Sequence, residues 1–505
     1  MYHFPFNFDN FLSPTMVGRS LWAQRLSTVA LLTVGAYGAS ETCCKRLVTA
    51  LSANKVLTPP TPAYGVENSK YWSSTSVLTP SCIFVPESSS DVSAALKILV
   101  KHNCEFGVRG GGHTANPGWA GTNSGVLISL SKFNDIKVSD DRKSVAIAAG
   151  NRWGDVYAKT EEYGVTVTGG RVSSVGVSGF LLGGGLSFLM HSEGFSANNV
   201  LSYEMVLANG TVSTVTAESA RDLFKALKGG TGNFGIATSF TLRTFPIKDV
   251  YAGNLYYTPD KYDALFPIME EFARDGIESD PKTHMISTFI SAPSQSLQLA
   301  AFYSFYSEPV TAPPPAIKPF FDVPTTVNTV RVKTVKEAAD ELGTGNDLRA
   351  YSIRANAGLY KQLVDLCYST TDELNSTTGW GSAIIFQPIS NSMIRASDRK
   401  GGNVLGLKPA ADPLILVSYQ FSWASPLDDK KVYATVDKLI AASIGIARSQ
   451  GRLGRYIYLN YASTNQKPIE SYGPDQVDFL RKVKAKYDPN GVFEKLSRGG
   501  FKIPS

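Results

Sequence analysis

The chain has 505 residues, a hydrophobic fraction of 43% and a charged fraction of 18%, so it can bury a large core and is too apolar to be disordered. The net charge of +6 is spread thinly, and no run of Lys or Arg has interleaved aromatic residues. This excludes a nucleic acid as the expected partner. The densest basic cluster, from Arg481 to Lys486, is interpreted as the solvated face of a C-terminal helix.

Residues 1–40 are expected to form a leader and a signal peptide. Arg25 precedes an apolar stretch from Leu26 to Gly38, and two small residues follow it, which is the pattern of a secretory signal. The stretch is too short to span a bilayer stably. Met1 and Met16 are both candidate starts, and a buried first helix is the alternative interpretation.

Four of the five cysteines follow the expected cleavage site closely. They are Cys43, Cys44, Cys82 and Cys104, whereas Cys367 lies far beyond them. In an oxidising compartment this distribution predicts one or two disulfides that tie down an N-terminal arm over residues 41–75, with the pairing left open. A metal site is the weaker interpretation, because the chain has no CxxC pair and only five histidines.

The next elements indicate a mixed α+β domain over residues 76–246. An amphipathic helix over Pro86–Val100 leads into a strand over Glu105–Arg109. Further helices are expected over Arg152–Tyr163 and Arg221–Lys228, and further strands over Val126–Leu130, Ser144–Ala149, Val165–Thr168, Tyr203–Ala208 and Ile236–Phe245. Pro246 ends the last strand and marks the boundary.

Residues 247–450 are expected to form a second domain, in which a sheet is backed by helices. The expected strands are His284–Ile290, Leu297–Tyr306, Ala383–Gln387 and Leu414–Trp423, and the expected helices are Tyr262–Arg274 and Asp428–Ser449. The last stretch, residues 451–505, is predicted to hold a strand at Tyr456–Tyr461, a helix at Asp475–Lys486 and a turn at Asp488–Gly491. Asparagine sequons at Asn209 and Asn375 agree with secretion.

Two glycine-dense segments are suited to a diphosphate. Gly110–Gly112 follows a strand and carries no Cβ, so successive backbone N–H groups can converge on an anion. The second segment, from Gly169 to Gly185, adds the hydroxyls of Ser173 and Ser174. Two such loops facing each other would hold the phosphates of a dinucleotide. A plain tight turn is the alternative interpretation of the first segment.

A third glycine segment, Gly230–Gly235, matches GxGxxG but stands between a helix and a strand. A Rossmann site needs the reverse order, so this match is interpreted as a decoy. The sequence also lacks a G-x-S-x-G elbow and a P-loop, which argues against a hydrolase and a P-loop enzyme. His113 is the candidate nucleophile toward an electron-poor carbon, with a hydrogen-bonded structural histidine as the alternative.

Five ordered motifs together resemble the berberine bridge enzyme-like FAD-linked oxidases of the vanillyl-alcohol oxidase superfamily. They are Arg109–His113, Ser173–Gly176 with Gly183–Gly185, Gly232–Gly235, Tyr458–Tyr461 and Tyr487–Asn490. The resemblance runs from about Cys43 to the C-terminus. It implies a PCMH-type FAD-binding domain of two α+β subdomains, a substrate domain whose antiparallel sheet covers the flavin, and a return of residues 451–505 to the FAD-binding domain.

The same resemblance implies roles for single residues. His113 falls on the histidine that bonds the flavin 8α-methyl carbon, and Val172 replaces the cysteine of a second attachment, so one covalent bond is expected. Val175 lies where family members influence oxygen access, and its small side chain is compatible with an oxidase. The residues expected to line FAD are Arg109, Gly110, Gly111, Gly112, His113, Thr114, Ser173, Ser174, Gly176, Gly179, Asn199, Ile236, Asn460 and Tyr461.

The resemblance identifies no catalytic base. Gln387, Tyr419 and Gln420 occupy the region where family members use Tyr, Glu or Asp, and no carboxylate aligns there. Tyr458 and Tyr461 are the leading candidates for proton transfer, with Tyr419 and Gln420 as further polar candidates, since a phenol of lowered pKa can assist removal of a hydroxyl proton. Buried structural tyrosines are the alternative interpretation.

The expected function is oxidation of a small organic molecule by hydride transfer to FAD, with molecular oxygen as acceptor and hydrogen peroxide as product. The substrate sheet lacks an obvious polar carbohydrate lining, which favours a secondary-metabolite intermediate as substrate. The alternatives are a carbohydrate oxidase, a flavin dehydrogenase with another acceptor, and a non-catalytic flavin-binding protein. A secreted or lumenal protein without a membrane span is expected.

Overall fold

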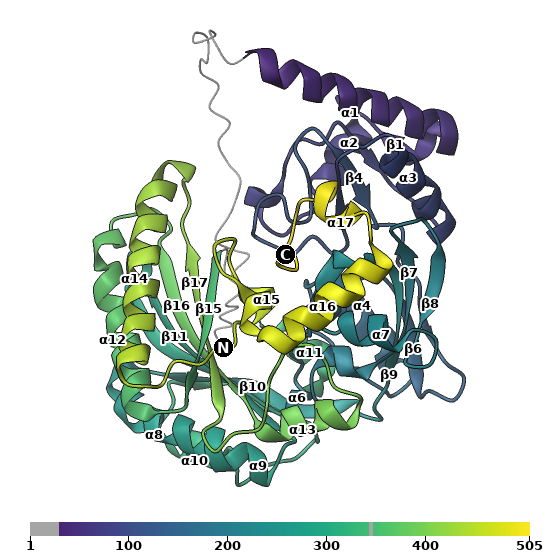
Figure 1. Ribbon diagram of the computed structural model, residues 1–505. Helices are drawn as coiled ribbons and strands as arrows, with labels where there is room; N and C mark the ends of the chain where they lie inside the picture. Colours follow the sequence, from purple (N-terminus) through teal and green to yellow (C-terminus); the bar gives the residue numbers. More distant parts are fainter. Residues whose placement is uncertain (1–29, 343–346) are drawn as a thin grey trace.

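The computed structural model describes residues 30–342 and 347–505, with side chains from residue 41 onward except those of residues 347 and 348. The expected leader before residue 30 lies outside the described residues. Three sheets organise this part of the chain (Figure 1). Two of them stand on one side of the molecule, and a larger third sheet stands on the other (Figure 1).

The two smaller sheets come from the first half of the chain. The first has the order β1 (Val56–Leu57), β2 (Cys82–Phe84), β4 (Val126–Ser129) and β3 (Phe106–Arg109), with β4 parallel to both neighbours. The second is antiparallel, in the order β5 (Ile136–Val138), β6 (Ser144–Ala148), β9 (Gly235–Arg243), β7 (Val200–Leu207) and β8 (Val212–Val215).

Helices pack around these two sheets and connect many of their strands. They are α1 (Ala30–Leu51), α2 (Pro62–Asn68), α3 (Ser89–Lys101), α4 (Trp153–Glu161), α5 (Val177–Leu182), α6 (Met190–Glu193) and α7 (Arg221–Ala226). In α3 the Ser88 hydroxyl accepts from the Asp91 N–H and caps the first turn, while Val92, Leu96 and Leu99 are buried on one face. This face packs onto β7, so α3 ties the second sheet to its surroundings.

The third sheet is antiparallel and comes from the second half of the chain. Its order is β13 (Val327–Asn328), β10 (Asp249–Tyr257), β12 (Leu297–Tyr306), β11 (Thr283–Ala292), β16 (Gly381–Ile389), β17 (Leu414–Ser422) and β15 (Asp347–Arg354), and β14 (Arg331–Thr334) also pairs with β10. Its helices are α8 (Tyr262–Glu271), α9 (Ile277–Ser279), α10 (Lys318–Asp322), α11 (Val335–Asp340), α12 (Ala357–Thr371), α13 (Asn391–Arg399) and α14 (Asp429–Ser449).

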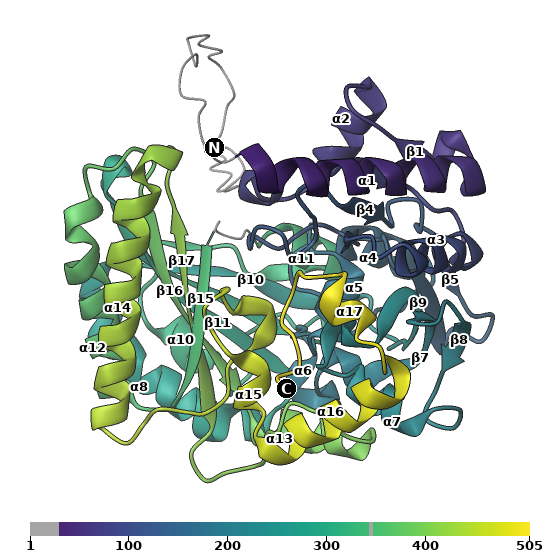
Figure 2. The ribbon, with the colours of Figure 1, turned by 45° about the horizontal axis from the view of Figure 1, so that its top comes forward.

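The two faces of the third sheet belong to different cores. Helices α8, α12 and α14 cover one face (Figures 1 and 2), where Val417, Tyr419 and Phe421 of β17 pack with them. Leu416 of β17 and Tyr303 of β12 are buried in the core of the two smaller sheets. Because side chains alternate along a strand, this sheet presents every second residue of β17 to the first half of the chain.

The C-terminal segment returns to the smaller sheets, as Figure 2 shows for the yellow helices. It contains α15 (Pro468–Ser471), α16 (Pro474–Tyr487) and α17 (Val492–Lys495). Helix α16 packs against α7. The expected turn after α16 is present, since the Gly491 N–H donates to the Asp488 carbonyl over 3.0 Å.

Two expected strands are wrong. Val165–Thr168 forms only an isolated bridge between Thr166 and Phe245, because β9 already pairs with β6 on one edge and β7 on the other. Tyr456–Tyr461 forms no strand and ends in a 3-10 turn over Leu459–Tyr461. It begins beside the edge strand β15, where the Ser352 hydroxyl donates to the Tyr456 carbonyl over 2.6 Å, and it then reaches the second glycine segment, where an added Cβ on Gly183 would touch the Asn460 side chain.

The N-terminal arm is tied down by two disulfides, which confirms that expectation. Cys43 bonds Cys104 and Cys44 bonds Cys82, across sequence separations of 61 and 38 residues. Both bonds join α1 to the first sheet and its loops. Among the described residues, every helix is too short or too polar to traverse a bilayer.

Loss of either disulfide is expected to lower the free energy of unfolding by about 2–4 kcal/mol, because each closes a long loop in the unfolded chain. The paired variant Cys44→Ser with Cys82→Ser, compared with the wild type by thermal denaturation, measures this effect. The buried Cys367 forms no disulfide, so Cys367→Ser is the matched control. Added reductant should lower its melting temperature as much as it lowers that of the wild type. Equal melting temperatures for the paired variant and the wild type would contradict the expectation.

Candidate functional site

A cavity of about 400 Å³ lies between the smaller sheets and the third sheet, within the size range of ligand sites. Its wall includes places that are distant in sequence: residues 110–116, residues 170–186, residues 231–237, Gln420 of β17, residues 458–462 and residues 497–502. The molecule therefore brings both predicted glycine segments, the third sheet and the C-terminal return to one space.

The two glycine segments touch backbone to backbone at this cavity. A Cβ on Gly111 would lie 2.3 Å from the Gly176 Cα, and a Cβ on Gly176 would lie 2.6 Å from the Gly111 Cα. Gly112 has a φ of +64°, which favours glycine. Side chains are thus excluded from the crossing, and the backbone amides of both segments are left to bind an anion. The crossing fits the diphosphate of a dinucleotide.

His113 stands at the end of the first glycine segment. Its ring stacks on Trp72 of the N-terminal arm, with 4.7 Å between centroids and 16° between planes. Its Nε2 lies 3.0 Å from the Ser174 Oγ of the second segment. Burial, together with the nearby Arg152 cation, lowers the pKa of His113 to about 4. The imidazole is therefore neutral at neutral pH and competent as a nucleophile.

Most residues predicted to line FAD do line this cavity. They are Gly110, Gly111, Gly112, His113, Thr114, Gly176, Gly179, Ile236, Asn460 and Tyr461. Ser174 contributes through its contact with His113. Val172 and Val175 also line the cavity. Arg109, Ser173 and Asn199 do not belong to the lining.

Arg109 points away from the cavity because it is the last residue of β3 and its neighbour Gly110 turns toward the cavity. Its guanidinium forms an ion pair of 2.6 Å with the Glu67 carboxylate and donates to the Ser129 hydroxyl over 2.9 Å. Burial opposes ionisation of Glu67, but bonds from Lys70, Ser129 and Arg109 leave its pKa below the usual value. Arg109 therefore anchors the N-terminal arm under the first glycine segment.

Asn199 lies in the core. Its amide donates to the carbonyl oxygens of Glu193 and Phe195 and accepts a bond from Lys400 over 2.6 Å. It therefore fixes the turn after α6 and links it to the loop after α13.

Ser173 is turned toward α11 on the third-sheet side. Its N–H donates to the Ala339 carbonyl over 3.1 Å, and its hydroxyl donates to the Asp340 carboxylate. Ser173 immediately precedes Ser174, the residue that contacts His113. Helix α11 thus braces the second glycine segment from outside the cavity.

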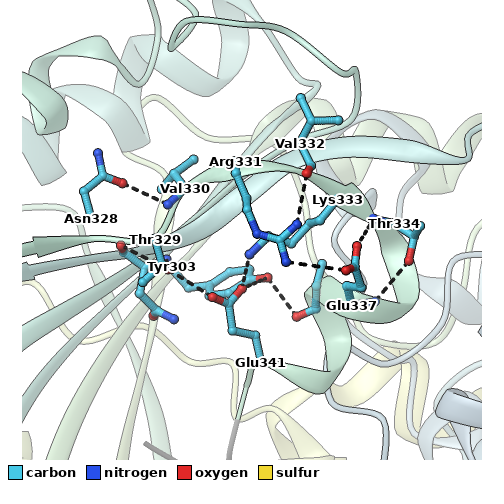
Figure 3. A network of polar contacts seen from close by, with 12 residues as sticks. Tyr303, Asn328, Thr329, Val330, Arg331, Val332, Lys333, Thr334, Glu337 and Glu341 are labelled. Carbon is cyan, nitrogen blue, oxygen red and sulfur yellow. Dashed lines mark hydrogen bonds and ion pairs between the residues drawn. The ribbon is translucent and has the colours of Figure 1, made fainter. Parts of the chain in front are cut away.

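A polar network holds α11 in place (Figure 3). The Tyr303 hydroxyl donates to the Ala338 carbonyl over 2.8 Å, and Lys333 forms an ion pair with Glu341 just beyond the helix. Thr334 and Glu337 form a capping box at the start of the helix. Figure 3 shows these groups clustered between β14 and the end of α11, so the brace is rigidly tied to the third sheet.

The candidate catalytic residues separate into two groups. Tyr458, Tyr461 and Gln420 line the cavity. Tyr419 does not, because it lies on the helix-covered face of the third sheet with its hydroxyl 2.8 Å from the Ser443 Oγ of α14. Burial raises the pKa of Tyr419 well above its usual value. The neighbouring position, Gln420, faces the cavity because side chains alternate along β17.

Tyr461 and Tyr458 differ in their surroundings. The Tyr461 hydroxyl accepts a hydrogen bond from the Arg171 guanidinium over 3.0 Å. The Tyr458 hydroxyl accepts from the Asn460 amide over 3.0 Å, and burial, assisted by the neighbouring Tyr461, raises the Tyr458 pKa. Tyr458 is therefore held in its neutral form, whereas Tyr461 lies beside a permanent cation.

Sequence reasoning missed a buried chain that begins at Arg171. The Arg171 Nη1 lies 2.9 Å from the His284 Nε2, and the His284 Nδ1 lies 3.3 Å from the His191 Nε2. The Arg171 Nη2 also donates to the Gln387 carbonyl oxygen over 2.6 Å. The Gly-Gly-Arg sequence before Val172 was a visible signal for Arg171, whereas no local pattern indicates that the two histidines meet.

Two other parts of the lining contain residues that were not among the predicted site residues. The segment interpreted as a Rossmann decoy contributes Thr231, Gly232 and Gly235 to the cavity wall. The C-terminal tail contributes Lys502, whose ammonium donates to three backbone carbonyls and whose pKa burial lowers to about 8. Aspartate and glutamate are absent from the described lining of this cavity.

Comparison with known proteins agrees with this site. Residues 80–216 match the FAD binding domain family model, and residues 457–495 match the berberine and berberine-like family model. The FAD-dependent monooxygenase sdcF of Emericella nidulans is 34% identical over 475 residues, which cover 92% of this chain and 98% of that protein. The FAD-dependent monooxygenase drtC of Aspergillus calidoustus is 34% identical and covers 91% of this chain and 90% of its own.

Solved structures share the fold. The 6-hydroxy-D-nicotine oxidase of Arthrobacter nicotinovorans aligns with a TM-score of 0.73 at 21% identity, over 89% of this chain and 97% of that chain. The xylooligosaccharide oxidase of Myceliophthora thermophila aligns with a TM-score of 0.74 at 20% identity, over 92% and 99%. These likenesses confirm the α+β fold, with a PCMH-type FAD-binding part and a helix-backed antiparallel sheet.

The fold, the cavity and the family models define an FAD-dependent oxidoreductase. More specifically, the chain belongs to the berberine-like family of FAD-dependent oxidoreductases.

Proposed function

We propose that this protein is an oxidase that carries FAD on His113 through one covalent bond and oxidises a small secondary-metabolite intermediate, with molecular oxygen as the final acceptor. The observation that carries this proposal is the position of His113. Its neutral imidazole is fixed by Trp72 and Ser174 and stands beside the point where Gly111 and Gly176 touch backbone to backbone. Bound FAD would supply the acceptor for a hydride from a substrate carbon, and oxygen would take up the two electrons with two protons and leave as hydrogen peroxide.

The residues that would hold FAD are those of the two glycine segments, together with Ile236, Asn460 and Tyr461 on the remaining walls. The division of the chain that we propose follows the sheets, with residues 76–246 as the FAD-binding domain, 247–450 as the substrate domain and 451–505 as the returning segment. This division supports a site in which each part contributes a wall.

The contact between His113 and Ser174 supports attachment through one particular nitrogen. When the His113 Nε2–H donates to the Ser174 hydroxyl, the lone pair of Nδ1 is left to bond the flavin methyl carbon. That carbon would lose one hydrogen as a proton, and the electron pair of the broken C–H bond would pass into the flavin ring and from there to oxygen, the proposed acceptor. Trp72 covers one ring face, which fixes the orientation of the imidazole. Val172 provides no nucleophile on the second segment, which supports a single attachment.

The direct test of oxidase function is the ratio of peroxide released to substrate consumed under air. We expect about one peroxide per substrate, since two electrons reduce one oxygen molecule. The relatives are named monooxygenases, which supports oxygen as a co-substrate. Oxygen uptake with labelled oxygen retained in the product would replace the oxidase by a monooxygenase, and turnover only with a quinone or dye acceptor would indicate a dehydrogenase.

We further propose that the protein is secreted. The two disulfides support an oxidising compartment. The sequon residues Asn209 and Asn375 are both exposed, so they are accessible to glycosylation.

A further inference from the structure

We propose that Arg171 binds an oxygen anion of the substrate, either a carboxylate or an ionised acidic hydroxyl, and so makes the enzyme selective for acidic substrates. The inference rests on the proposed function, because it concerns the substrate of the same cavity.

Arg171 is a buried cation whose hydrogen-bond partners among the described residues are all neutral. Only 6% of the residue is exposed, and its guanidinium contacts the His284 imidazole, the Gln387 amide and the Tyr461 hydroxyl. Among the described residues, no carboxylate forms an ion pair with Arg171, whereas Arg109 pairs with Glu67 and Arg274 pairs with Asp412. A buried charge without a counter-ion is costly, so a cavity that keeps one is suited to receive an anion.

The histidine chain holds the guanidinium without neutralising it. Because Arg171 can only donate, the His284 Nε2 must accept, its Nδ1–H then donates to the His191 Nε2, and the His191 Nδ1–H donates to the Ser390 hydroxyl. Burial, together with the charge on Arg171, lowers the pKa of His284 well below its usual value and that of His191 to about 3. His284 and His191 are therefore positioning residues that stay neutral.

The electrostatic setting of the cavity also favours an anion. Aspartate and glutamate do not occur in the described lining, so an incoming anion meets no like charge. The second cation in the wall, Lys502, already donates to the carbonyls of Phe493, Ser497 and Gly499. Arg171 lies instead beside Tyr461, a candidate catalytic residue. A substrate anchored on its guanidinium would be placed next to that phenol.

The test uses titrations of the flavin-loaded enzyme, with binding read from the change in the flavin visible spectrum. Benzoate is compared with benzamide, and pentafluorophenolate with pentafluoroanisole, so that the two sources of an oxygen anion are separated. We expect one or both anions to bind about 10- to 100-fold more tightly than the neutral analogue, which is the worth of a charge-assisted hydrogen bond. Arg171→Met should remove this preference and leave binding of the neutral analogue unchanged.

Arg171→Lys, which keeps the charge but loses the planar fork, should keep part of the preference and is the matched variant. The comparison in the wild type stands even if the Arg171→Met protein fails to fold. Equal binding of anion and neutral analogue by the wild type, or an unchanged preference in folded Arg171→Met, would overturn the proposal. The proposal would also be overturned if the wild type showed no anion preference and Arg171→Met had a lowered flavin reduction potential. The Arg171 cation would then act on the flavin and not on the substrate.

The proposed function is tested separately on the same samples. Acid precipitation reports whether the flavin is covalently held, and peroxide release reports whether oxygen is the acceptor. If the flavin is released by acid but the enzyme still binds anions more tightly than neutral analogues, the proposed covalent bond to His113 is contradicted and the proposed role of Arg171 stands.

Discussion

Replacing His113 with alanine is expected to remove every trace of covalently bound flavin and to leave a folded protein that still binds FAD reversibly. The imidazole is the nucleophile in the proposed attachment, whereas the glycine crossing of Gly111 and Gly176 does not depend on it. Flavin fluorescence of the protein band on a denaturing gel measures the covalent fraction. The wild-type band should fluoresce, and the His113→Ala band should be dark.

Ser174→Ala is the matched control for this experiment. It removes the 3.0 Å contact to the His113 Nε2 and keeps the nucleophile, so the attached fraction should fall or form more slowly without vanishing. A fluorescent band of wild-type intensity in His113→Ala would show that another residue carries the flavin. Melting curves of both variants check that the fold is intact.

Replacing Tyr461 with phenylalanine is expected to slow flavin reduction by substrate about 10²- to 10⁴-fold, the usual contribution of a positioned proton-transfer group. The change removes the hydroxyl that contacts the Arg171 guanidinium and keeps the ring, which packs edge-on against Tyr458 at 4.9 Å between centroids. Anaerobic stopped-flow measurement of flavin bleaching gives the rate, and the acid-precipitated spectrum shows that the flavin content is unchanged.

Two further tyrosines calibrate this result. Tyr419→Phe should leave the rate of flavin reduction at the wild-type value, because Tyr419 contacts Ser443 on the opposite face of the third sheet. Tyr458→Phe should have a smaller effect than Tyr461→Phe, since burial raises its pKa and disfavours proton release. A Tyr461→Phe enzyme that reacts within about threefold of the wild type would remove this residue from proton transfer.

The parts of the site that sequence predicted well are those set by local chemistry. Three consecutive glycines before His113 admit few backbone roles, and the structure places them against the second glycine segment, at Gly176. The paired cysteines near the N-terminus likewise indicated a tied arm. The glycine signal is contained in a short run of residues, and the cysteine signal lies in the grouping of four cysteines between Cys43 and Cys104.

Side-chain direction and long-range partners were harder to predict. Arg109 belongs to the predicted motif, but its direction depends on Glu67, a partner in the N-terminal arm. Tyr419 and Gln420 are neighbours on β17 and face opposite ways, so a shift of one residue exchanges their roles.

Meeting points of distant elements have no local signal. Arg171, His284 and His191 come from a loop, a strand of the third sheet and α6. Their contact depends on how the third sheet packs against the smaller sheets. The strand expected at Val165–Thr168 failed for a similar reason, because the pairing of both edges of β9 is a property of the whole sheet.

The visible spectrum of the purified wild-type protein before and after acid precipitation tests the central proposal most directly. Binding of FAD by the two glycine segments and its covalent bond to His113 predict a yellow protein whose flavin absorbance stays in the washed pellet. A colourless pellet with free FAD in the supernatant would contradict the covalent bond. A protein that remains colourless after incubation with excess FAD would contradict the binding of FAD by the two glycine segments.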